Sequence, residues 1–395
     1  MSGLFPVRAL PPVGDPVRLR PRSGPATEVA PLQGASFLDS GTAALAFILK
    51  AIVTYARKQG FAGSEVLIPA YGCPDIVSAI EFAGCRARLV DVDGDSPFPS
   101  QQAWVAGIDE RTLAVVSVGF LGLRDPLPPV ALQAGGLAAH AFVEDCCQVH
   151  PMAVCHGSQW RDGPTDRNLA FSFGRGKPVS MLHGGAARLV PDLVPYQPVL
   201  PPDDGRTVGF ARLSATAGLY NLLRSPWLYG WVERLPCLGV GHTEYTPLRS
   251  LQAMNPRVRD CVNPQQDWPD QRRLTLQKRI RECLLESRPK ALAADLWRTA
   301  GREDDWLLRY PLLMQTREAR DEALTRLREA GLGVSAMYRQ ALPDIAGVRQ
   351  HLAEPVRCDG ARRFADRLLT LPLHRDVRER DVLSMCDLLT QVGRS

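Results

Sequence analysis

The sequence predicts an α/β protein: a large domain with a mainly parallel central sheet, followed by a smaller C-terminal α+β domain. The main observation is that short β-branched apolar runs alternate with helical patterns across residues 36–190. Such alternation is typical of βαβ units and therefore of parallel strands. The length of 395 residues supports two domains, because one domain usually contains roughly 100–200 residues.

The large domain is expected to begin with a helix over 42–59. Apolar residues recur there at helical spacing, and Gly60 follows as a C-cap. Strands and helices then alternate: a strand at 65–71, a helix at 74–85, and strands at 86–93, 112–120 and 138–148. Two more apolar runs enclose a glycine-rich loop within 169–190. Because parallel sheets bind ligands at the carboxyl ends of their strands, polar residues at those ends are candidate site residues.

The C-terminal part has a different pattern. Residues 271–297 predict a charged amphipathic helix whose basic residues form a solvated face. A strand, a helix, a second strand and a closing helix are expected at 306–314, 317–332, 333–338 and 375–392. We therefore expect three regions: an N-terminal arm rich in Pro, Arg and Gly at 1–35, the large domain at 36–250, and the small domain at 251–395.

Composition narrows the class of protein. Hydrophobic residues make up 45% and charged residues 23%, which is ordinary globular usage and excludes disorder as the main state. Lys plus Arg number 47 against 42 Asp plus Glu, and a net charge of +5 is too mild at this length to indicate nucleic-acid binding. No window approaches ~18 uninterrupted apolar residues, so no membrane-spanning helix is expected.

The cysteines and the N-terminus predict a cytoplasmic protein with reduced thiols. None of the ten cysteines forms a CxxC pair, so no metal site is expected. The opening segment MSGLFPVRALPPVGDPVRLRP has no uninterrupted apolar core and no small-residue cleavage site, unlike a signal peptide. Cytoplasmic thiols remain reduced.

Three local motifs bear on chemistry, and the first is LDSGTAAL at 38–45. A strand-like entry is followed by Ser40, Gly41 and Thr42, and then by a helix. Free N–H groups at a helix N-terminus favour an anion, and a glycine lets a phosphate approach closely. The alternative is an ordinary N-cap with a turn glycine, and this alternative is favoured when the motif is taken alone.

The second motif is AFVEDCCQVH at 141–150. An apolar strand ends in Glu144 and Asp145, with Gln148 and His150 beyond it. A carboxylate at the end of a buried strand needs a cationic partner, and a protonated pyridine nitrogen is one such partner. The alternative is an acidic residue that only caps the next turn.

The third motif is the glycine-rich loop within LAFSFGRGKPVSMLHGGAARLV at 169–190. Ser172 lies five residues before Lys177 in this loop. An amine in a partly desolvated loop has a lowered pKa and can form a Schiff base. The alternative is a surface lysine in a loop, which is the commoner situation of any single lysine.

The three motifs together predict a pyridoxal phosphate site. The phosphate needs hydrogen-bond donors, the ring nitrogen needs an acidic partner that keeps it protonated, and the aldehyde needs a lysine. The anion site, the carboxylate at a strand end and the lysine in a glycine-rich turn occur in this order along the chain.

These segments resemble the DegT/DnrJ/EryC1/StrS family of pyridoxal-phosphate-dependent sugar aminotransferases, which have the aspartate aminotransferase type of fold. SGTAAL at 40–45 is similar to the family's phosphate-side turn, and 66–93 is similar to its second strand, helix and third strand. VEDCCQVH at 143–150 resembles the family's E-D-A-A-Q-x-H segment, and FSFGRGK at 171–177 resembles F-S-F-x-x-x-K. The stretch 362–382 is similar to the family's L-P-L-H-P region.

The resemblance implies a role for each matching residue. Lys177 would be the Schiff-base lysine and then the general base and acid of the proton shift. Asp145 would pair with the pyridine nitrogen, and Gln148 would lie near the 3-hydroxyl of the ring. The residues that would hold the phosphate are Gly41, Thr42 and Ser172.

The chain departs from the family in the residues around the ring and the substrate. The family usually stacks an aromatic residue on the ring, and the corresponding position here is Cys73, with Tyr71 two residues before it. Either the ring packs on the smaller group or Tyr71 takes its place. GFARLS at 209–214 lacks the Asn of the family's G-x-N-x-R-M-S segment. In AMYRQ at 336–340 Met337 replaces the family's His while Tyr338 remains as a weak candidate substrate contact.

Residues 215–240 have no counterpart in the family. Trp227, Tyr229 and Trp231 cluster there, and an exposed aromatic patch usually marks an interaction site. The alternatives are a lid over the substrate, a subunit contact and a patch resting on a membrane surface. Burial in the chain's own core or in a dimer interface is favoured, because Pro226, Gly230 and Pro236 break any long helix that could lie flat on lipid.

The resemblance implies a homodimeric aminotransferase. It would move an amino group from an amino acid, glutamate, to a nucleotide-linked keto-sugar, for polysaccharide or glycoconjugate biosynthesis. One alternative is another pyridoxal phosphate reaction on a sugar, such as dehydration, although related dehydratases lack the lysine that stands here at 177. The other is a scaffold or regulatory protein that has lost the chemistry.

Overall fold

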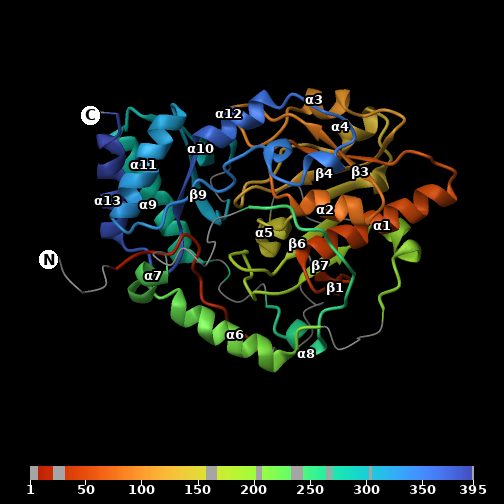
Figure 1. Ribbon diagram of the computed structural model, residues 1–395, viewed down its shortest axis with the longest axis horizontal. Coiled ribbons are helices and arrows are strands. Elements are labelled where there is room, and N and C mark those ends of the chain that lie inside the picture. The colour runs from red at the N-terminus through yellow and green to blue at the C-terminus, as the bar shows by residue number, and fades with distance from the viewer. Residues whose placement is uncertain are drawn as a thin grey trace.

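A computed structural model describes residues 8–20, 32–156, 167–201, 207–232, 243–263, 268, 270–301 and 305–393. Figure 1 shows a large sheet with its helices on one side of the molecule and a second group of strands and helices on the other. The predicted α/β class with a mainly parallel sheet is therefore confirmed. Parts of the predicted arm (1–7 and 21–31) and of the segment 215–240 (233–240) lie outside the described residues.

The large domain is built on a seven-stranded sheet. Its strands lie in the order β1-β7-β6-β5-β4-β2-β3, and the five from β6 to β3 pair in parallel while β1 and β7 pair antiparallel. The strands are β1 (Ser36–Leu38), β2 (Glu65–Pro69), β3 (Arg86–Val90), β4 (Thr112–Val118), β5 (Phe142–Asp145), β6 (Asn168–Ser172) and β7 (Gly185–Arg188). The strands predicted at 65–71, 86–93, 112–120 and 138–148 correspond to β2 to β5, although β5 is much shorter than predicted because residues 139–141 form the 3-10 helix η3. The strands β6 and β7 correspond to the two apolar runs within 169–190, and β1 to the strand-like entry before Ser40.

Helices cover this sheet, and the longest of them, α1 (Gly41–Lys58), is buried along most of its length. Ser40 caps it by accepting the Ala43 N–H at 3.1 Å, and Gly60, with φ of +77°, turns the chain away at its end. The other helical segments of this domain are α2 (Asp75–Phe82), α3 (Gln101–Ala106), α4 (Pro129–Ala134), η3 (Ala139–Ala141), α5 (Pro151–His156) and η4 (Pro191–Tyr196). The predicted helices at 42–59 and 74–85 correspond to α1 and α2.

The small domain holds an antiparallel sheet in the order β10-β9-β8. Its strands are β8 (Leu292–Asp295), β9 (Arg309–Met314) and β10 (Leu368–Pro372). Its helical segments are α9 (Gln271–Ser287), α10 (Leu296–Ala300), α11 (Arg317–Glu329), η6 (Leu342–Asp344), η7 (Arg349–His351), α12 (Asp359–Arg367) and α13 (Glu379–Gln391).

Two expectations for the small domain are wrong. The helix expected over 271–297 ends at Ser287, because Arg288 adopts a left-handed conformation with φ of +44° and Pro289 follows. The strand expected at 333–338 forms only an isolated bridge between Ser335 and Thr370, and β10 is the third strand instead.

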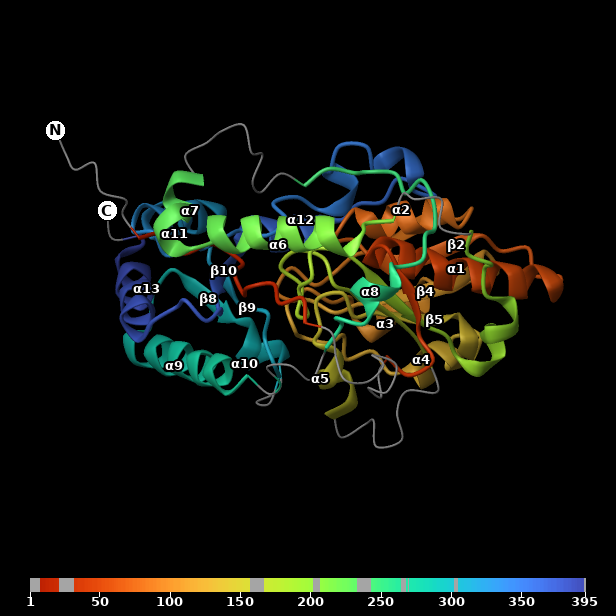
Figure 2. The ribbon, with the colours of Figure 1, turned by 90° about the horizontal axis from the view of Figure 1, so that it is seen from below.

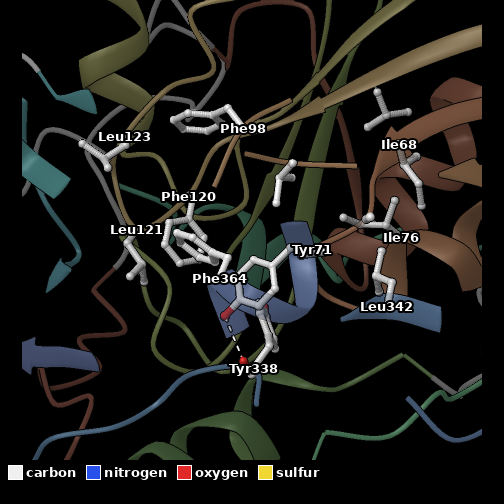
Figure 3. Close-up of a cluster of buried hydrophobic side chains, with 14 of the residues drawn as sticks. Ile68, Tyr71, Ile76, Phe98, Phe120, Leu121, Leu123, Tyr338, Leu342 and Phe364 are labelled. Atoms are coloured by element: carbon white, nitrogen blue, oxygen red, sulfur yellow. Dashed lines mark hydrogen bonds between the residues drawn. The ribbon is translucent and has the colours of Figure 1, made fainter. Parts of the chain in front are cut away.

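The two domains share a continuous apolar core. The segment after residue 341 returns to the large domain, where the Leu342 N–H donates to the Ala70 carbonyl at 2.9 Å. Figure 3 shows Tyr71 packed against Phe120 and Phe364, with ring centroids 5.8 and 4.8 Å away. Elements of both domains therefore hold the carboxyl ends of β2 and β4 in place.

The described part of the N-terminal arm, residues 8–20, is seated between the small domain and helix α6 (Phe210–Leu223). Arg8 forms a 2.8 Å ion pair with Asp381, and the Leu10 N–H donates to the Gly331 carbonyl at 2.8 Å. On the other side, Asn221 of α6 exchanges two 2.9 Å hydrogen bonds with the backbone of Val17. The arm thus links α6 to the small domain.

Helices α6 and α7 (Pro226–Val232) present an apolar surface to the outside. Figures 1 and 2 show α6 on an outer face that extends across both domains, with α7 beside the small domain and α8 (Pro256–Arg259) near its other end. We define the α6–α7 face by its exposed apolar side chains, which are Leu219, Leu222, Leu223, Trp227, Leu228 and Trp231. Within this single chain, Tyr229 is buried, but Trp227 and Trp231 are 55% and 49% exposed and are not part of its core.

None of the helices in the described ranges is both long and apolar enough to cross a membrane.

Candidate active site

Lys177 stands in a tight loop between β6 and β7. Gly176, with φ of +69°, turns the chain immediately before the lysine. At the end of the loop the Gly184 N–H donates to the Asp39 carbonyl at 2.9 Å. The loop is therefore fastened to the turn that precedes α1, which brings Lys177 and the N-terminus of α1 to the same place.

The two acidic residues at the end of β5 have different environments. Because side chains alternate across a strand, Glu144 and Asp145 point to opposite faces of the sheet. Glu144 forms ion pairs with Arg124 at 2.7 Å and Arg167 at 3.3 Å. Asp145 instead lies in the cavity that contains Lys177, and its Oδ1 accepts the Cys147 N–H at 2.9 Å. Asp145 is thus the carboxylate that is available to a ligand.

The N-terminus of α1 has the properties of a phosphate site. Ser40 accepts the Ala43 N–H, and the N–H groups of Gly41 and Thr42 have no acceptor within the helix. A Cβ atom at Gly41 would lie 2.5 Å from the Ser172 Cβ. Only glycine therefore lets the helix start this close to the Ser172 hydroxyl, and the donors of both segments meet at one point.

These groups face one cavity of about 320 Å³. The predicted site residues that line it are Gly41, Thr42, Cys73, Asp145, Ser172 and Lys177. His183 also lines it, and its Nε2 is a buried polar atom without a hydrogen-bond partner among the described residues. An amine, a carboxylate, an anion-binding helix end and an unsatisfied polar atom fit pyridoxal phosphate, which carries an aldehyde, a ring nitrogen and a phosphate.

The expected lowering of the Lys177 pKa is wrong for the cofactor-free protein. Burial by itself would lower the pKa of this amine, but nearby groups that carry negative charge when ionised raise it: Cys147, Cys73, Asp145 and Asp75. Burial raises the pKa of the Cys73 thiol to about 12 and that of Cys147 well above its ordinary value, so both thiols are neutral near pH 7. Of the groups that raise the pKa of Lys177, the two thiols contribute most and the carboxylates of Asp145 and Asp75 contribute less.

The carboxyl group of Asp145 is also shifted. Burial raises its pKa, while hydrogen bonds from Cys147 and the positive charge of Lys177 partly oppose that effect. A cation placed beside Asp145 would favour its ionised form. The cavity is consequently suited to a protonated ring nitrogen at this position.

Three other predicted site residues lie behind the cavity wall. Gln148 is buried and uses both ends of its amide, accepting the Leu121 N–H at 3.0 Å and donating to the Tyr338 hydroxyl at 3.1 Å. The Tyr71 hydroxyl donates to the Tyr338 carbonyl at 2.9 Å (Figure 3). Neither Gln148, Tyr71 nor Tyr338 is among the residues that line the cavity, whereas Cys73 is.

Four lining residues with ionisable side chains were not predicted as site residues: Asp39, Asp75, Cys147 and His183. The first three each lie two residues from a predicted site residue, namely Gly41, Cys73 and Asp145. Their proximity along the chain could have indicated them, because residues next to a strand end or a helix start lie at the same edge of a parallel sheet. Burial lowers the pKa of His183, so this ring is neutral near pH 7.

The mainly parallel sheet, the antiparallel small domain and a lysine facing a carboxylate define the class of fold type I pyridoxal phosphate enzymes. The chain belongs to the DegT/DnrJ/EryC1/StrS aminotransferase family, whose model matches residues 33–190 and 266–390. It is accordingly a pyridoxal-phosphate-dependent aminotransferase, and pyridoxal phosphate is its cofactor. No curated protein sequence matches the chain.

Solved structures share this fold at low sequence identity. DesI in the presence of its TDP-sugar product is 19% identical, with a TM-score of 0.64, over 97% of this chain and 92% of that one. The putative sugar aminotransferase Spr1654 from Streptococcus pneumoniae, in its PLP form, is 18% identical, with a TM-score of 0.62, over 91% and 87%. The 3-amino-5-hydroxybenzoic acid synthase is 20% identical, with a TM-score of 0.61, over 91% and 87%.

Proposed function

We propose that this protein transfers an amino group from an amino acid, glutamate, to a nucleotide-linked keto-sugar, for polysaccharide or glycoconjugate biosynthesis. The observation that carries the proposal is that Lys177, Asp145 and the N-terminus of α1 face one cavity. The similarity to DesI, which was solved with a TDP-sugar product, and to the putative sugar aminotransferase Spr1654 supports a sugar acceptor.

When bound, pyridoxal phosphate supplies an aldehyde that takes up the amino group and a ring that accepts the electron pair released at the substrate carbon. The chain's own groups bind and orient it. The N–H groups of Gly41 and Thr42 and the Ser172 hydroxyl hold the phosphate at the N-terminus of α1. The Asp145 carboxylate keeps a proton on the ring nitrogen.

Lys177 has two tasks in this proposal. Its Nζ would hold the cofactor through the aldehyde carbon, with loss of water, and once a substrate amine takes that place the released amine would move a proton at the substrate carbon. The groups around Lys177, the Cys147 and Cys73 thiols first and the Asp145 and Asp75 carboxylates after them, raise the pKa of its amine. Pairing of Asp145 with a protonated ring nitrogen would remove one of these contributions.

We further propose that the enzyme is a homodimer that uses the α6–α7 face as a subunit contact. Six large apolar side chains are exposed on this face, and four of them, Leu219, Leu222, Trp227 and Trp231, are about half exposed or more. Large exposed apolar patches mark interaction sites, and closed two-fold dimers are the commonest assembly.

A catalytically lapsed scaffold is the second candidate, motivated by the changed positions Cys73 and Met337. Lys177, Asp145 and Gly41 all line one cavity, and this favours a catalytically active enzyme over a scaffold. Sugar dehydration is disfavoured by the lysine itself.

A half-reaction experiment separates these candidates. Loaded enzyme is mixed with one equivalent of glutamate, and the keto acid and the cofactor spectrum are measured. Formation of one keto acid per site, followed by amination of a nucleotide-linked keto-sugar, supports the proposal. No keto acid from glutamate or from any of the other standard amino acids contradicts it and favours the scaffold.

A further inference from the structure

The N-terminal arm lies directly behind the Lys177 loop. Gly176, whose φ of +69° turns the chain, immediately precedes Lys177. Apart from its own chain neighbours, the three atoms nearest to a Cβ placed on Gly176 all belong to the Val13 side chain, at 3.1–3.2 Å. Residues 12–15 of the arm, together with Gly176 and Lys177, line a narrow space of about 20 Å³, which has room for about one water molecule. The backbone that carries Lys177 is therefore closely packed against the arm.

The small domain anchors the arm on both sides of Val13. Before it, the Pro11 carbonyl accepts a hydrogen bond from the His374 Nε2–H at 2.9 Å. After it, the Asp15 carboxylate forms an ion pair with Arg273 of α9. Val13 therefore lies between two points that are fixed on the small domain.

Arg309 binds the arm at the residue before Val13. This guanidinium is 2% exposed, and it donates to the Pro12 carbonyl, to the Gly333 carbonyl at 3.4 Å, and to the hydroxyl and carbonyl of Thr370 at 2.8 and 3.1 Å. These acceptors are all neutral, and burial lowers the pKa of Arg309 to about 9. A buried cation needs each of its acceptors, so the Pro12 carbonyl is part of the hydrogen bonding of the small domain.

Glycines whose backbone is close to the arm line its path. Gly331 and Gly333 of the small domain have φ of +69° and +63°. A Cβ on Gly331 would lie 2.7 Å from the Arg8 carbonyl oxygen, and one on Gly333 would lie 2.7 Å from that of Leu10. Together with Gly176, these turns accept the arm at positions where a side chain would exclude it.

The arm itself is stiff around Val13. Pro11, Pro12 and Pro16 each fix φ near about −65°, so this segment loses less conformational entropy on ordering than a flexible chain would. Figure 2 shows the described part of the arm, in red, running from the small domain toward the large domain. A short, stiff segment that is anchored on one domain is suited to hold a loop of the other.

Hydrogen bonds within the Lys177 loop fix its turn. The Lys177 N–H and the Ser180 hydroxyl both donate to the Gly174 carbonyl, at 3.3 Å each. These bonds set the shape of the loop but not its distance from the small domain. Residues 174–180 are half-buried or exposed, so the contact with Val13 contributes to the position of the loop.

We propose that Val13 is a positioning residue for Lys177. Its side chain prevents Gly176 from moving away from the cofactor cavity and thereby keeps the Lys177 amine within reach of the aldehyde carbon of the cofactor. A reacting group that is misplaced by about 1 Å can lose about 10²-fold in rate, so support at this point has a large effect. The inference rests on the proposed role of Lys177 and holds for any amino donor and acceptor. Val13 stands outside residues 33–190 and 266–390, which match the family model.

Binding of two ligands to the full-length protein, freed of cofactor, tests the inference. Pyridoxal phosphate has the aldehyde that bonds to Lys177, whereas pyridoxamine phosphate has an amine in its place and occupies the cavity without that bond. We expect Val13→Ala to weaken binding of pyridoxal phosphate about tenfold and to leave the affinity for pyridoxamine phosphate within about twofold of wild type, because only the first ligand needs a correctly placed amine. Equal loss for both ligands, or no loss for either, would overturn the inference.

Val17→Ala is the matched control, because Val17 is a buried valine of the same arm that does not line the space behind Lys177. It should lower the melting temperature at least as much as Val13→Ala and leave the binding of both ligands unchanged. If it weakens pyridoxal phosphate as much as Val13→Ala does, the arm only stabilises the fold and the inference is wrong. Val13→Leu, which removes the branch at Cβ without emptying the site, takes the place of Val13→Ala in this comparison if that variant folds poorly.

Lys177→Ala separates this inference from the role on which it rests. If that variant keeps the absorption band of the lysine-bound cofactor, Lys177 does not hold the cofactor and both proposals fail. If it loses the band while Val13→Ala binds pyridoxal phosphate like wild type, the role of Lys177 stands and only the inference about Val13 fails. Loss of the band in Lys177→Ala, with selective loss of pyridoxal phosphate affinity in Val13→Ala, supports both.

Discussion

Helices α1 and α6 are both apolar, yet they occupy opposite kinds of position. Of the 18 residues of α1, 11 are buried, whereas α6 buries only Leu213 and Ala217 among its 14. Helix α1 is covered by the sheet and α2, while α6 lies on the outside of the molecule (Figure 2). Apolar composition therefore does not decide which helix forms the core.

The N-terminal ends of the two helices differ in the same way. Ser40 caps α1 with its side chain, and Gly41 packs against Ser172. Gly209 begins α6 without a side-chain cap, and Gly218 within α6 has no atom near the position of a Cβ. The N-terminal end of α1 is closely packed against other residues of the chain, whereas α6 has an exposed surface that a partner can contact. The expected effects of substitution should follow this difference.

The largest effect is expected at the cavity beneath α1. Lys177→Ala removes the amine that binds the cofactor, so the absorption band of the lysine-bound cofactor should vanish and borohydride should fix none of it to the protein. Turnover should fall by about 10²–10⁴-fold or more, as for loss of a general acid–base group. Lys278→Ala, on the solvent side of α9, is the control. A variant that keeps both the band and turnover would refute the assignment of Lys177.

The next effect is expected at Asp145. Asp145→Asn removes the charge that keeps the ring nitrogen protonated, so transamination should fall by orders of magnitude while the fold survives. Glu144→Gln is the matched control: it weakens the ion pairs to Arg124 and Arg167, costs about 1–3 kcal/mol of stability, and leaves the cofactor spectrum unchanged. Near-normal turnover of Asp145→Asn would show that this carboxylate does not face the ring.

The same carboxylate predicts a pH dependence. Because burial raises the pKa of Asp145 in the cofactor-free protein, it becomes protonated at a higher pH than a free Asp. Cofactor affinity should therefore decline as the pH falls through this raised pKa, and the variant Asp145→Asn should lose that decline. The buried carboxylate also disfavours folding as the pH rises from the unfolded to the folded pKa. Titrations of cofactor binding at several pH values test the first statement.

A smaller effect on stability is expected from substitutions at Gly41 of α1 and Gly218 of α6, and its sign should differ between the two positions. Gly41→Ala places a Cβ 2.5 Å from the Ser172 Cβ, so it should cost about 1–3 kcal/mol and weaken cofactor binding. Gly218→Ala meets no atom within 4 Å and should stabilise α6 by about 0.5–1 kcal/mol. Thermal unfolding measures both. Equal changes in melting temperature, with the same sign in both variants, would contradict the predicted difference between the two helices.

The smallest effect on the folded chain is expected on the α6–α7 face. Replacing Trp227 and Trp231 by Ala should change the stability of a single chain by less than about 0.5 kcal/mol each, because both are half exposed. Trp104→Ala, which empties a fully buried site, should cost about 3–5 kcal/mol. If the face joins two subunits, the double variant should become monomeric in sedimentation. A dimer of unchanged mass that no longer binds anionic vesicles would favour a membrane surface instead.

Much of the site was accessible from sequence because its parts are local. A glycine at a helix start, an acidic residue at a strand end and a lysine in a glycine-rich turn each reveal themselves in short segments, and Gly41, Asp145, Ser172 and Lys177 do meet in one cavity. The sequence did not indicate whether Cys73 or Tyr71 lies at the cofactor cavity. The position of Tyr71 depends on how residues 338–364 pack against the large domain, because Tyr71 contacts Phe364 and the Tyr338 carbonyl.

The sequence by itself determined the alternation of strands and helices, the order of the three motifs and the family, because periodicity, capping and turn chemistry act over a few residues. Only the tertiary structure decided that the thiols of Cys147 and Cys73 and the carboxylates of Asp145 and Asp75 surround Lys177, and that α1 is covered while the α6–α7 face is not. It also decided that residues 15, 16 and 18 of the N-terminal arm line a cavity beside the Lys177 loop. The physical reason is that pKa values, burial and cavities depend on which distant segments become neighbours, and no local pattern contains that information.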